Sequence, residues 1–339
     1  MEEIQEINIL SLQETPEETQ YDFNPKTFDE YLGQEELKKK LAIYTQAAKM
    51  RNEALDHLLL FGPPGLGKTT LSQIMAEVMG VHIKICSGPM MERTGDLVAI
   101  LSSLDPRDIL FIDEIHRMPI AVEEVLYSAM EHFRVDVIVG QGAGAKSINL
   151  PIHPFTLIGA TTKSGAISAP LRSRFGISER LDFYTDEELK EIVLQNAQFL
   201  DCAIESESAL IIGKCARGTP RVAKKILRRV RDVAQVTNAN VAHPELVQKA
   251  LKFLGIDEEG LTKVDHMILK NIVTNFNGGP VGLETIASMV GEDKDTIELV
   301  YEPFLMRKGY IEKTPRGRQI PHTKLPFLKQ KFMGQGTLL

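Results

Sequence analysis

The feature that most constrains this chain is a glycine-rich segment that follows a short apolar run. The run is HLLLF at 57–61, and after it comes Gly62-Pro63-Pro64-Gly65-Leu66-Gly67-Lys68-Thr69, which matches G-x-x-x-x-G-K-[S/T] in full. A short apolar run bounded by glycine is typical of a strand buried on both faces of a parallel sheet. The glycines allow consecutive backbone N–H groups to face a phosphate, and a helix that begins near Lys68 adds the positive end of its dipole. A chance glycine turn is the alternative. The position between a strand and a helix favours a nucleotide site.

Two side chains of this segment have expected contacts of their own. Lys68 would reach the β- and γ-phosphates of ATP, and the Thr69 hydroxyl would bind Mg²⁺.

Hydrolysis requires acidic groups as well, and a second apolar run supplies them. Asp113 ends the run DILFID at 108–113, and Glu114 follows it. Asp113 could hold Mg²⁺ through water, while Glu114 could orient and polarise the attacking water. Two acids after an apolar run often only enter a helix cap, but their position after Lys68 favours a hydrolytic pair.

A third apolar run, FTLIGA at 155–160, ends in Thr161 and Thr162. One of these hydroxyls, Thr162 in preference, could hold the catalytic water; the alternative is a threonine that only satisfies its own strand end. With helices expected at 69–79, 94–104 and 119–133, the strands and helices alternate. The fold class is therefore α/β, with a parallel sheet and its ligand at the carboxyl ends of the strands.

Two arginines, Arg172 and Arg174, follow within a dozen residues. An Arg-x-Arg pair is usually surface charge. Close to a nucleotide site, Arg174 could instead act on the γ-phosphate of a neighbouring subunit.

The remainder of the chain predicts a small helical domain. Thr185 and Glu188 have capping-box spacing and open a helix that runs to about residue 200. Further helices are expected near 206–217, 219–237 and 244–254. The segment Gly218-Thr219-Pro220-Arg221 starts the most basic helix. Its cations Lys224, Lys225, Arg228 and Arg229 are expected to form a solvated or subunit-facing surface rather than to bind a ligand.

The last part of the chain predicts a winged helix. Helical stretches at 265–275, 282–290 and 294–308 precede a hairpin that contains Lys313, Arg316 and Arg318, with no acid among them. Winged helices often mediate only protein contacts. Here the three cations, with no acid among them, favour contact with the phosphates of a nucleic acid over reading of its bases.

Charge and cysteine usage agree with a protein of the cytoplasm. Six glutamates and no Lys or Arg lie in residues 1–20, so most of the net charge of −7 belongs to an expected flexible acidic tail, while residues 302–339 are basic. The three cysteines are far apart and form no disulfide or zinc pattern.

The ordered segments GPPGLGKTT, ILFIDEIHRM, FTLIGATTKSGAISAPLRSRFGI, GTPRVAKKILRRVRD and EPFLMRKGYIEKTPRGR resemble the AAA+ ATPases, and within them the RuvB family of Holliday-junction branch-migration motors. The resemblance extends from about residue 22 to 330. It implies a large ATPase domain at 21–184 with a protruding hairpin at about 135–152, a lid at 185–255 and a winged-helix head at 256–339. It also implies a hexameric ring around duplex DNA, a Holliday junction as substrate, RuvA as partner and the resolvase RuvC as a further partner.

Mapped residue by residue, the resemblance makes Lys68 and Thr69 the phosphate and magnesium residues, Asp113 and Glu114 the hydrolytic pair, Thr162 the first sensor, Arg174 a finger acting in trans and Arg221 the second sensor. Further nucleotide contacts are implied at Phe23, Asn24, Gly65, Gly67, Thr70, Glu131, His132, Phe133 and Tyr184. This chain departs from the family at Asn24, where an arginine is usual, at His132, where an acid is usual, and at Thr94, where a proline is common.

The hairpin is implied to dock RuvA through exposed apolar side chains such as Ile138 and Ile148. A sheet edge of an ordinary domain is the alternative, but an exposed apolar hairpin invites aggregation unless a partner covers it.

Two other functions use many of the same parts. An ATP-switched DNA-binding assembly factor of clamp-loader type would share the ATPase and winged-helix domains. A nucleotide kinase would share the phosphate site but would have no use for Glu114 or a DNA-binding head.

Overall fold

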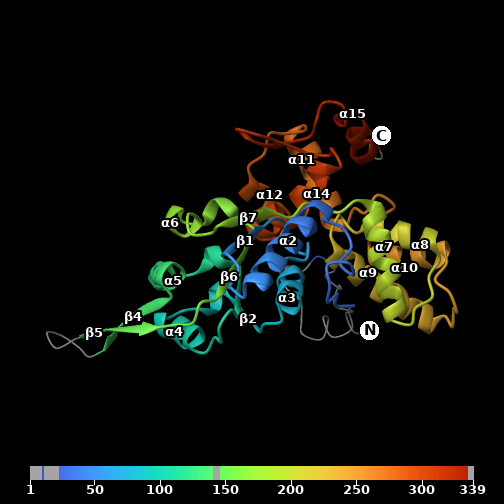
Figure 1. The fold of residues 1–339 in the computed structure, drawn as a ribbon. Helices are drawn as coiled ribbons and strands as arrows, with labels where there is room; N and C mark the ends of the chain where they lie inside the picture. The colour runs from blue at the N-terminus through green and yellow to red at the C-terminus, as the bar shows by residue number, and fades with distance from the viewer. Residues whose placement is uncertain (1–9, 11–22, 140–145, 335–339) are drawn as a thin grey trace. The chain divides into compact units, whose positions relative to one another are not determined.

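The chain forms two compact units, which are described separately (Figure 1). The computed structural model describes residue 10 and residues 23–139 and 146–334. The sheet unit is Asn24–Phe183; the helical unit contains the described residues from Tyr184 onward, with Leu10 and Phe23. Apart from Leu10, the expected acidic tail lies outside the described residues. Every helix in the described part of the chain is too short or too polar to traverse a lipid bilayer.

The sheet unit is built on parallel strands, as expected. The sheet described there has five strands in the order β2-β3-β6-β1-β7. Their bounds are β1 Leu58–Phe61, β2 Ile83–Ser87, β3 Ile109–Asp113, β6 Thr156–Thr161 and β7 Ile177–Arg180. All four strand pairs are parallel, with β6 paired to β3 on one side and β1 on the other. The carboxyl ends of β1, β3 and β6 therefore meet at one edge of the sheet.

Helices cover both faces of this sheet (Figure 1). Their bounds are α2 Glu35–Arg51, α3 Lys68–Met79, α4 Thr94–Ser102, α5 Ile120–His132 and α6 Ala169–Arg172. Side chains of α4 and α5 pack with Leu110, Ile112 and Leu157 of the strands. Helix α3 packs on β3 and β6, and it also contacts α2. The predictions of α3, α4 and α5 are confirmed.

The expected hairpin is present and extends away from the sheet (Figure 1). Strand β4 is Arg134–Val139, and it pairs antiparallel with β5, Lys146–Pro151. Val135, at its base, is buried, whereas Ile148 is 51% exposed. The backbone of Ile138 is described and pairs with Ser147, but its side chain lies outside the described part.

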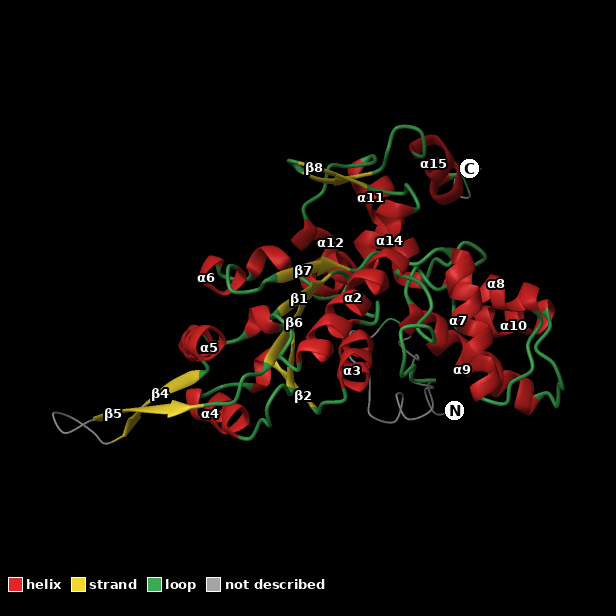
Figure 2. Cartoon of the chain, in the orientation of Figure 1, coloured by secondary structure: helices red, strands yellow, loops and turns green. Residues whose placement is uncertain are grey.

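The lid, all of whose residues are described, consists of helices joined by loops (Figure 2). These helices are α7 Asp186–Phe199, α8 Ser206–Cys215, α9 Pro220–Val236 and α10 Pro244–Phe253. The capping box opens α7 as predicted: Thr185 Oγ1 accepts the Glu188 N–H at 3.2 Å, and a Glu188 carboxylate oxygen accepts the Thr185 N–H at 2.8 Å.

The head has the predicted winged-helix order. It contains α11 Lys263–Phe276, α12 Leu283–Val290, a helical stretch 294–307, the wing strands β8 Glu312–Thr314 and β9 Gly317–Gln319, and α15 Leu325–Met333. The helical stretch is not one α-helix: α13 Lys294–Thr296 leads into a π turn, Ile297–Tyr301, and then into α14 Glu302–Arg307. Pro303 lacks an N–H and crowds the carbonyl four residues before it, so a wider turn relieves that conflict.

Candidate functional site

The glycine-rich loop joins β1 to α3 in the conformation that the motif predicts. Gly65 and Gly67 have φ values of 77° and 96°, in the left-handed region that favours glycine. A Cβ on Gly67 would lie 2.5 Å from the hydroxyl oxygen of Tyr31, and that hydroxyl donates to the Leu66 carbonyl at 3.1 Å. Tyr31 is buried, so it supports the loop from behind. Sequence reasoning missed Tyr31, because nothing near it in the chain marks a contact with a loop 35 residues later.

Lys68 begins α3, and its ammonium group lies on the loop. It donates to the carbonyls of Gly62 and Pro63, both at 2.9 Å, and the side chain is buried. Thr69 and Thr70 follow in the first turn of the helix and are partly exposed. The structure therefore gathers the lysine, the hydroxyls and the helix N-terminus around one loop.

Asp113 and Glu114 lie at the carboxyl end of β3. Asp113 Oδ1 accepts the Glu114 N–H at 2.9 Å, and Glu114 has φ 47°, which turns the chain out of the strand. Thr162 donates to the Glu114 carboxylate at 3.1 and 3.3 Å, and His116 Nδ1 lies 3.1 Å from Glu114 Oε2. The predicted hydrolytic glutamate is thus held from two sides, one of them the predicted sensor.

The neighbouring threonine has a different role. Thr161 is buried, its Oγ1 lies 2.9 Å from His116 Nδ1, and it accepts the Lys163 N–H at 3.0 Å. Thr161 therefore satisfies its own strand end, whereas Thr162 faces the carboxylate. The alternative of a threonine that satisfies its own strand end is thus found at Thr161, and a role of Thr162 at the catalytic water stays a prediction.

Arg174 is held within the sheet unit by three groups. It donates to the Pro170 carbonyl at 2.7 Å, pairs with Glu131 at 3.1 Å, and lies 4.5 Å from the centre of the Tyr127 ring. The Tyr127 hydroxyl in turn bonds the buried carboxylate of Glu123. Glu131 and Arg174, both predicted to act at a nucleotide, are thereby brought together.

The other predicted nucleotide contacts are distributed over both units. Phe133 packs in the core against Phe155, with ring centres 6.2 Å apart, while His132 is exposed at the end of α5. Asn24 is exposed in the sheet unit.

In the helical unit, Phe23 donates its N–H to Asn196 Oδ1 at 3.2 Å. Tyr184 is buried and donates its N–H to the Gly218 carbonyl at 3.0 Å. Arg221 lies at the start of α9.

His57 is a core residue, as expected for a histidine outside any ligand pattern. The Leu157 N–H donates to its Nδ1 at 2.9 Å, so Nε2 carries the proton and donates to the Met130 carbonyl at 3.1 Å. Burial lowers the pKa of His57, because the charged form would lose its hydration.

The three cysteines are free, and two of them, Cys202 and Cys215, are buried. Burial raises the pKa of Cys86 to about 12 and that of Cys215 to about 11. Burial also raises the pKa of Cys202.

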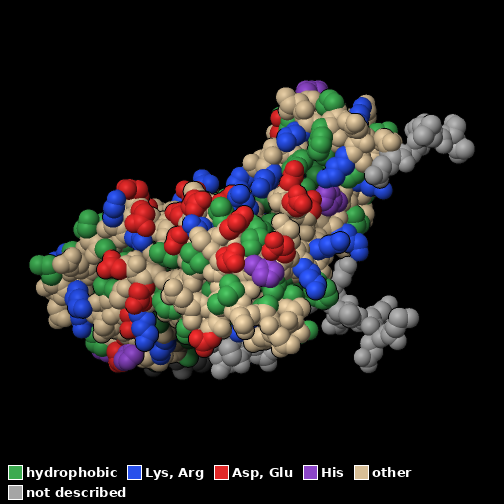
Figure 3. Space-filling model, turned by 90° about the vertical axis from the view of Figure 1, so that its right-hand side faces the viewer, with side chains coloured by type: hydrophobic (Ala, Val, Ile, Leu, Met, Phe, Trp, Pro, Cys, Tyr) green, Lys and Arg blue, Asp and Glu red, His purple; other side chains and the backbone are tan. Residues whose placement is uncertain are grey.

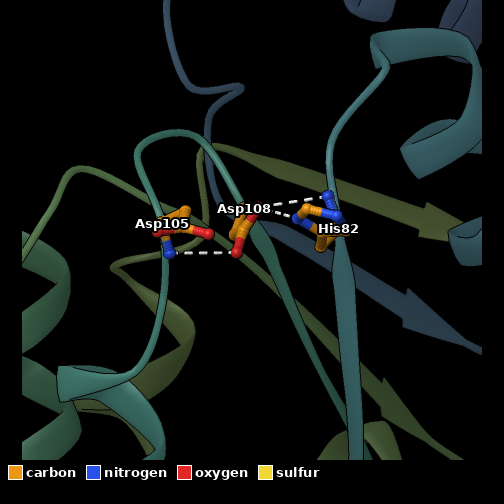
Figure 4. Close-up of side chains that lie close together, drawn as sticks. All are labelled: His82, Asp105 and Asp108. Carbon is orange, nitrogen blue, oxygen red and sulfur yellow. Dashed lines mark hydrogen bonds and ion pairs between the residues drawn. The ribbon is translucent and has the colours of Figure 1, made fainter.

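Within the described residues, one group of side chains of metal-ligating type lies close together, namely His82, Asp105 and Asp108 (Figure 4). The buried Asp108 carboxylate accepts the N–H of His82 at 3.1 Å and that of Asp105 at 3.0 Å. These bonds fix the turns that enter β2 and β3, at the edge of the sheet opposite the nucleotide loop. The cluster is a backbone cap.

The wing cations do not share one environment. Arg316, at the tip, is exposed. Arg318 donates through Nε and Nη2 to Glu302 Oε2 at 2.9 and 2.7 Å, and Lys313 Nζ lies 3.5 Å from Glu302 Oε1. Although no acid lies among these three cations in the sequence, α14 brings Glu302 to two of them. On the face drawn in Figure 3, basic and acidic side chains are interspersed.

Comparison with known proteins assigns all three parts of the chain. The family model described as the RuvB Holliday junction DNA helicase P-loop domain matches residues 23–181. The RuvB AAA lid domain matches residues 184–257, and the RuvB C-terminal winged helix domain matches 258–329.

Solved structures of Thermotoga maritima RuvB are similar to this chain. The one described as the RuvB Holliday junction branch migration motor is 49% identical, covers 90% of this chain and 98% of its own, and has a TM-score of 0.81. Two mutants of that protein are 49% and 48% identical, each with a TM-score of 0.83; they cover 90% and 91% of this chain and 98% and 99% of their own.

Proposed function

The chain belongs to the RuvB family of Holliday junction branch migration motors, and from that premise we propose that it couples ATP hydrolysis to the movement of duplex DNA through a ring of six copies. Its P-loop domain binds nucleotide and its enzymatic class is that of a P-loop ATPase. We further propose that the nucleotide is ATP with Mg²⁺. The ring, its partners and the roles of the site residues are proposed as well.

The observation that carries the proposal is the environment of Glu114. Its carboxylate stands at the end of β3, bonded by Thr162 and close to His116, one strand away from β6 and two from the nucleotide loop. A fixed carboxylate can orient a water and accept its proton as the water attacks the γ-phosphate. Thr162 would hold the same water or sense the phosphate, because its hydroxyl lies beside the carboxylate.

The loop and its surroundings fit a triphosphate and a magnesium ion. Lys68 and the N–H groups of the loop would hold the phosphates. Gly65 and Gly67 would let the backbone come close to the phosphates, and Thr70 would be a further contact. Thr69 and Asp113 offer the oxygen atoms that Mg²⁺ prefers, and Asp113 Oδ2 accepts no hydrogen bond from any described residue. Bound Mg²⁺ would supply charge neutralisation at the phosphates.

Arg174 and Glu131 would serve a nucleotide bound to the neighbouring subunit. Their ion pair places both on one surface of the sheet unit, as contact in trans requires. His132 and Phe133 would join this contact. Phe23, Tyr184 and Arg221 would be further nucleotide contacts, as the family implies, and Asn24 would contribute less than the usual arginine because it lacks a charge.

The head and the hairpin would bind the substrate and the partner. Lys313, Arg316 and Arg318 would contact phosphates of the duplex, and Ile138 and Ile148 on the hairpin would dock RuvA. RuvC is a further proposed partner. We propose the cytoplasm as the location of the chain, where duplex DNA is available to it.

The alternative function, an assembly factor of clamp-loader type, would give a different result in one assay. The motor should dissociate synthetic four-way junctions in the presence of ATP and RuvA, with turnover stimulated by DNA. An assembly factor would bind junctions and hydrolyse ATP but leave them intact, and that result would overturn the proposal.

The shared active site is tested by mixing two inactive variants. Lys68→Ala removes the pocket and keeps the finger, while Arg174→Ala keeps the pocket and removes the finger. In randomly mixed rings about one interface in four has both parts, so an equal mixture should recover about a quarter of wild-type turnover. Arg174→Ala mixed with the double variant is the matched control and should stay inactive. If the first mixture is equally inactive, Arg174 does not act in trans.

A further inference from the structure

The turn that joins α8 to α9 in the lid is also a contact surface for the head. Arg217 and Gly218 in this turn have φ values of 59° and 76°, and Thr219 closes the turn by donating its N–H to the Ala216 carbonyl at 3.0 Å. The Gly218 carbonyl accepts the Tyr184 N–H. Arg221, the proposed second sensor, follows in the first turn of α9. A shift of this turn would therefore accompany any shift of the proposed sensor.

Arg217 reaches from this turn into the head. Its Nη1 and Nη2 donate to the two carboxylate oxygens of Asp265, each at 2.9 Å. The arginine side chain is 4% exposed and the aspartate 0%. This two-bond geometry fixes the orientation of both groups as well as their separation. Because the pair is buried, separating its two partners would leave each charge without a counter-charge and without water around it, which is costly in free energy.

Asp265 also fixes the first helix of the head. One of its oxygens accepts bonds from the N–H and the hydroxyl of Thr262, both at 2.7 Å, and the Thr262 hydroxyl caps the helix in return. The carboxylate that receives the lid arginine is thus the same one that sets the start of α11. Turning the head relative to the lid would disturb both sets of bonds.

Aromatic side chains of the head complete the seat of the arginine. The Arg217 guanidinium carbon lies 4.2 Å from the centre of the Phe304 ring and 5.4 Å from that of Tyr301. Both rings are buried. From the head, Arg307 lies directly over the Gly218 Cα, where a Cβ would meet its guanidinium. The contact therefore has three components: an ion pair, cation–π stacking and close packing against glycine.

We infer that Arg217 is a positioning residue that fixes the head to the sensor turn, so that lid and head move as one body when nucleotide is hydrolysed. The inference rests on the proposed function, because it assigns the lid movement to the ATP cycle. It names the contact through which the movement is passed on. When the lid moves, the wing proposed to bind DNA would move with it, because no hinge lies between lid and head.

The test separates transmission from folding. Arg217→Lys keeps the positive charge but loses the two-bond geometry and the stacking. Asp265→Asn keeps the shape of the partner and removes its charge. Arg229→Lys is the matched control, because Arg229 lies on α9, the helix that follows the turn, and pairs with Asp232 at 3.0 Å at the surface. Three quantities are measured well below the unfolding temperature: ATP turnover, junctions dissociated per ATP, and the lid–head distance between spin labels at Lys249 and Lys270.

The expected result is a loss of coupling with hydrolysis retained. Arg217→Lys and Asp265→Asn should leave ATP turnover within about twofold while lowering junctions dissociated per ATP by roughly 3- to 30-fold. The distance distribution between the labels should broaden, and Arg229→Lys should change neither quantity. Wild-type coupling with a narrow distance distribution in both variants would overturn the inference. So would a parallel loss of turnover and coupling, which indicates a merely structural role. Failure of the wild type itself to dissociate junctions would instead overturn the proposed function.

Discussion

Replacement of Arg318 in the wing should have two separable effects, one on stability and one on DNA binding. The Arg318 guanidinium makes two bonds to Glu302, and the two side chains are 12% and 5% exposed. Removal of one partner from a fully buried pair costs about 3–5 kcal/mol. Lys313 remains 3.5 Å from the same carboxylate, and the pair is not fully enclosed. We therefore expect Arg318→Ala to destabilise the head by about 2–3 kcal/mol, which corresponds to a fall in Tm of about 10 °C.

The effect on DNA binding follows from the phosphate contact that we propose. Each contact contributes about 0.9 to the slope of log Kd against log salt, so Arg318→Ala should flatten that slope by about one unit with little change in sequence preference. Arg316→Ala should flatten the slope equally but leave Tm unchanged, because Arg316 is exposed at the wing tip. Salt titrations of duplex binding and thermal unfolding of the same proteins measure the two effects.

A second substitution distinguishes the causes. Glu302→Gln in the Arg318→Ala background removes the stranded carboxylate, so it should recover most of the lost stability while the salt slope stays low. An unchanged Tm in Arg318→Ala, or no recovery in the double variant, would refute the ion-pair reasoning. An unchanged slope would show that Arg318 supports the wing without touching DNA.

Two further substitutions test the sheet unit. Ile148→Asp should weaken RuvA binding by about tenfold or more, because a half-exposed isoleucine still has about 1.5 kcal/mol of burial to gain in an interface. Phe253→Asp, at an exposed apolar position of the lid, is the control. Unchanged RuvA affinity of the Ile148→Asp protein in titrations would contradict the docking surface. Glu131→Gln should lower ATP turnover by no more than about fivefold, since it removes only a partly exposed ion pair, whereas Arg174→Ala should lower it by about 10³-fold or more. If turnover collapses equally in both variants, the Glu131 carboxylate itself contacts the nucleotide.

The sequence predicted the interior of the sheet far better than its edges. Strands β1, β3 and β6 are buried on both faces and read as continuous apolar runs. Strands β2 and β7 lie at the edges, and their sequences, IKICS and ISER, mix apolar and charged residues because one side faces solvent. Helix α2 was missed for a similar reason: its sequence is largely polar, and its buried positions, such as Leu37 and Leu41, are widely spaced. The elements that could be predicted from the sequence were therefore those whose residues are buried on both faces.

The candidate site was predictable where spacing along the chain encodes chemistry. The nucleotide loop, the acids after β3 and the threonines after β6 are each local patterns, and parallel pairing alone brings them to one edge. The supporting residue Tyr31 was not assigned from the sequence, because its role arises from a contact across the fold.

The same limit applies to the ion pairs of three arginines, none of which was assigned from the sequence. Arg174, Arg217 and Arg318 each pair with a carboxylate from another element. A guanidinium has five donors, so one carboxylate can fix its direction and leave other donors for a phosphate. Arg318 uses Nε and Nη2 on Glu302, and among the described residues its Nη1 makes no hydrogen bond. The partner thus reduces the net charge that the wing presents, but it also removes conformational freedom before DNA arrives. The Arg217 side chain is 4% exposed, so its donors are enclosed between lid and head. Exposure of the guanidinium therefore distinguishes the arginines that we propose to bind a phosphate from the one that we propose to join lid and head.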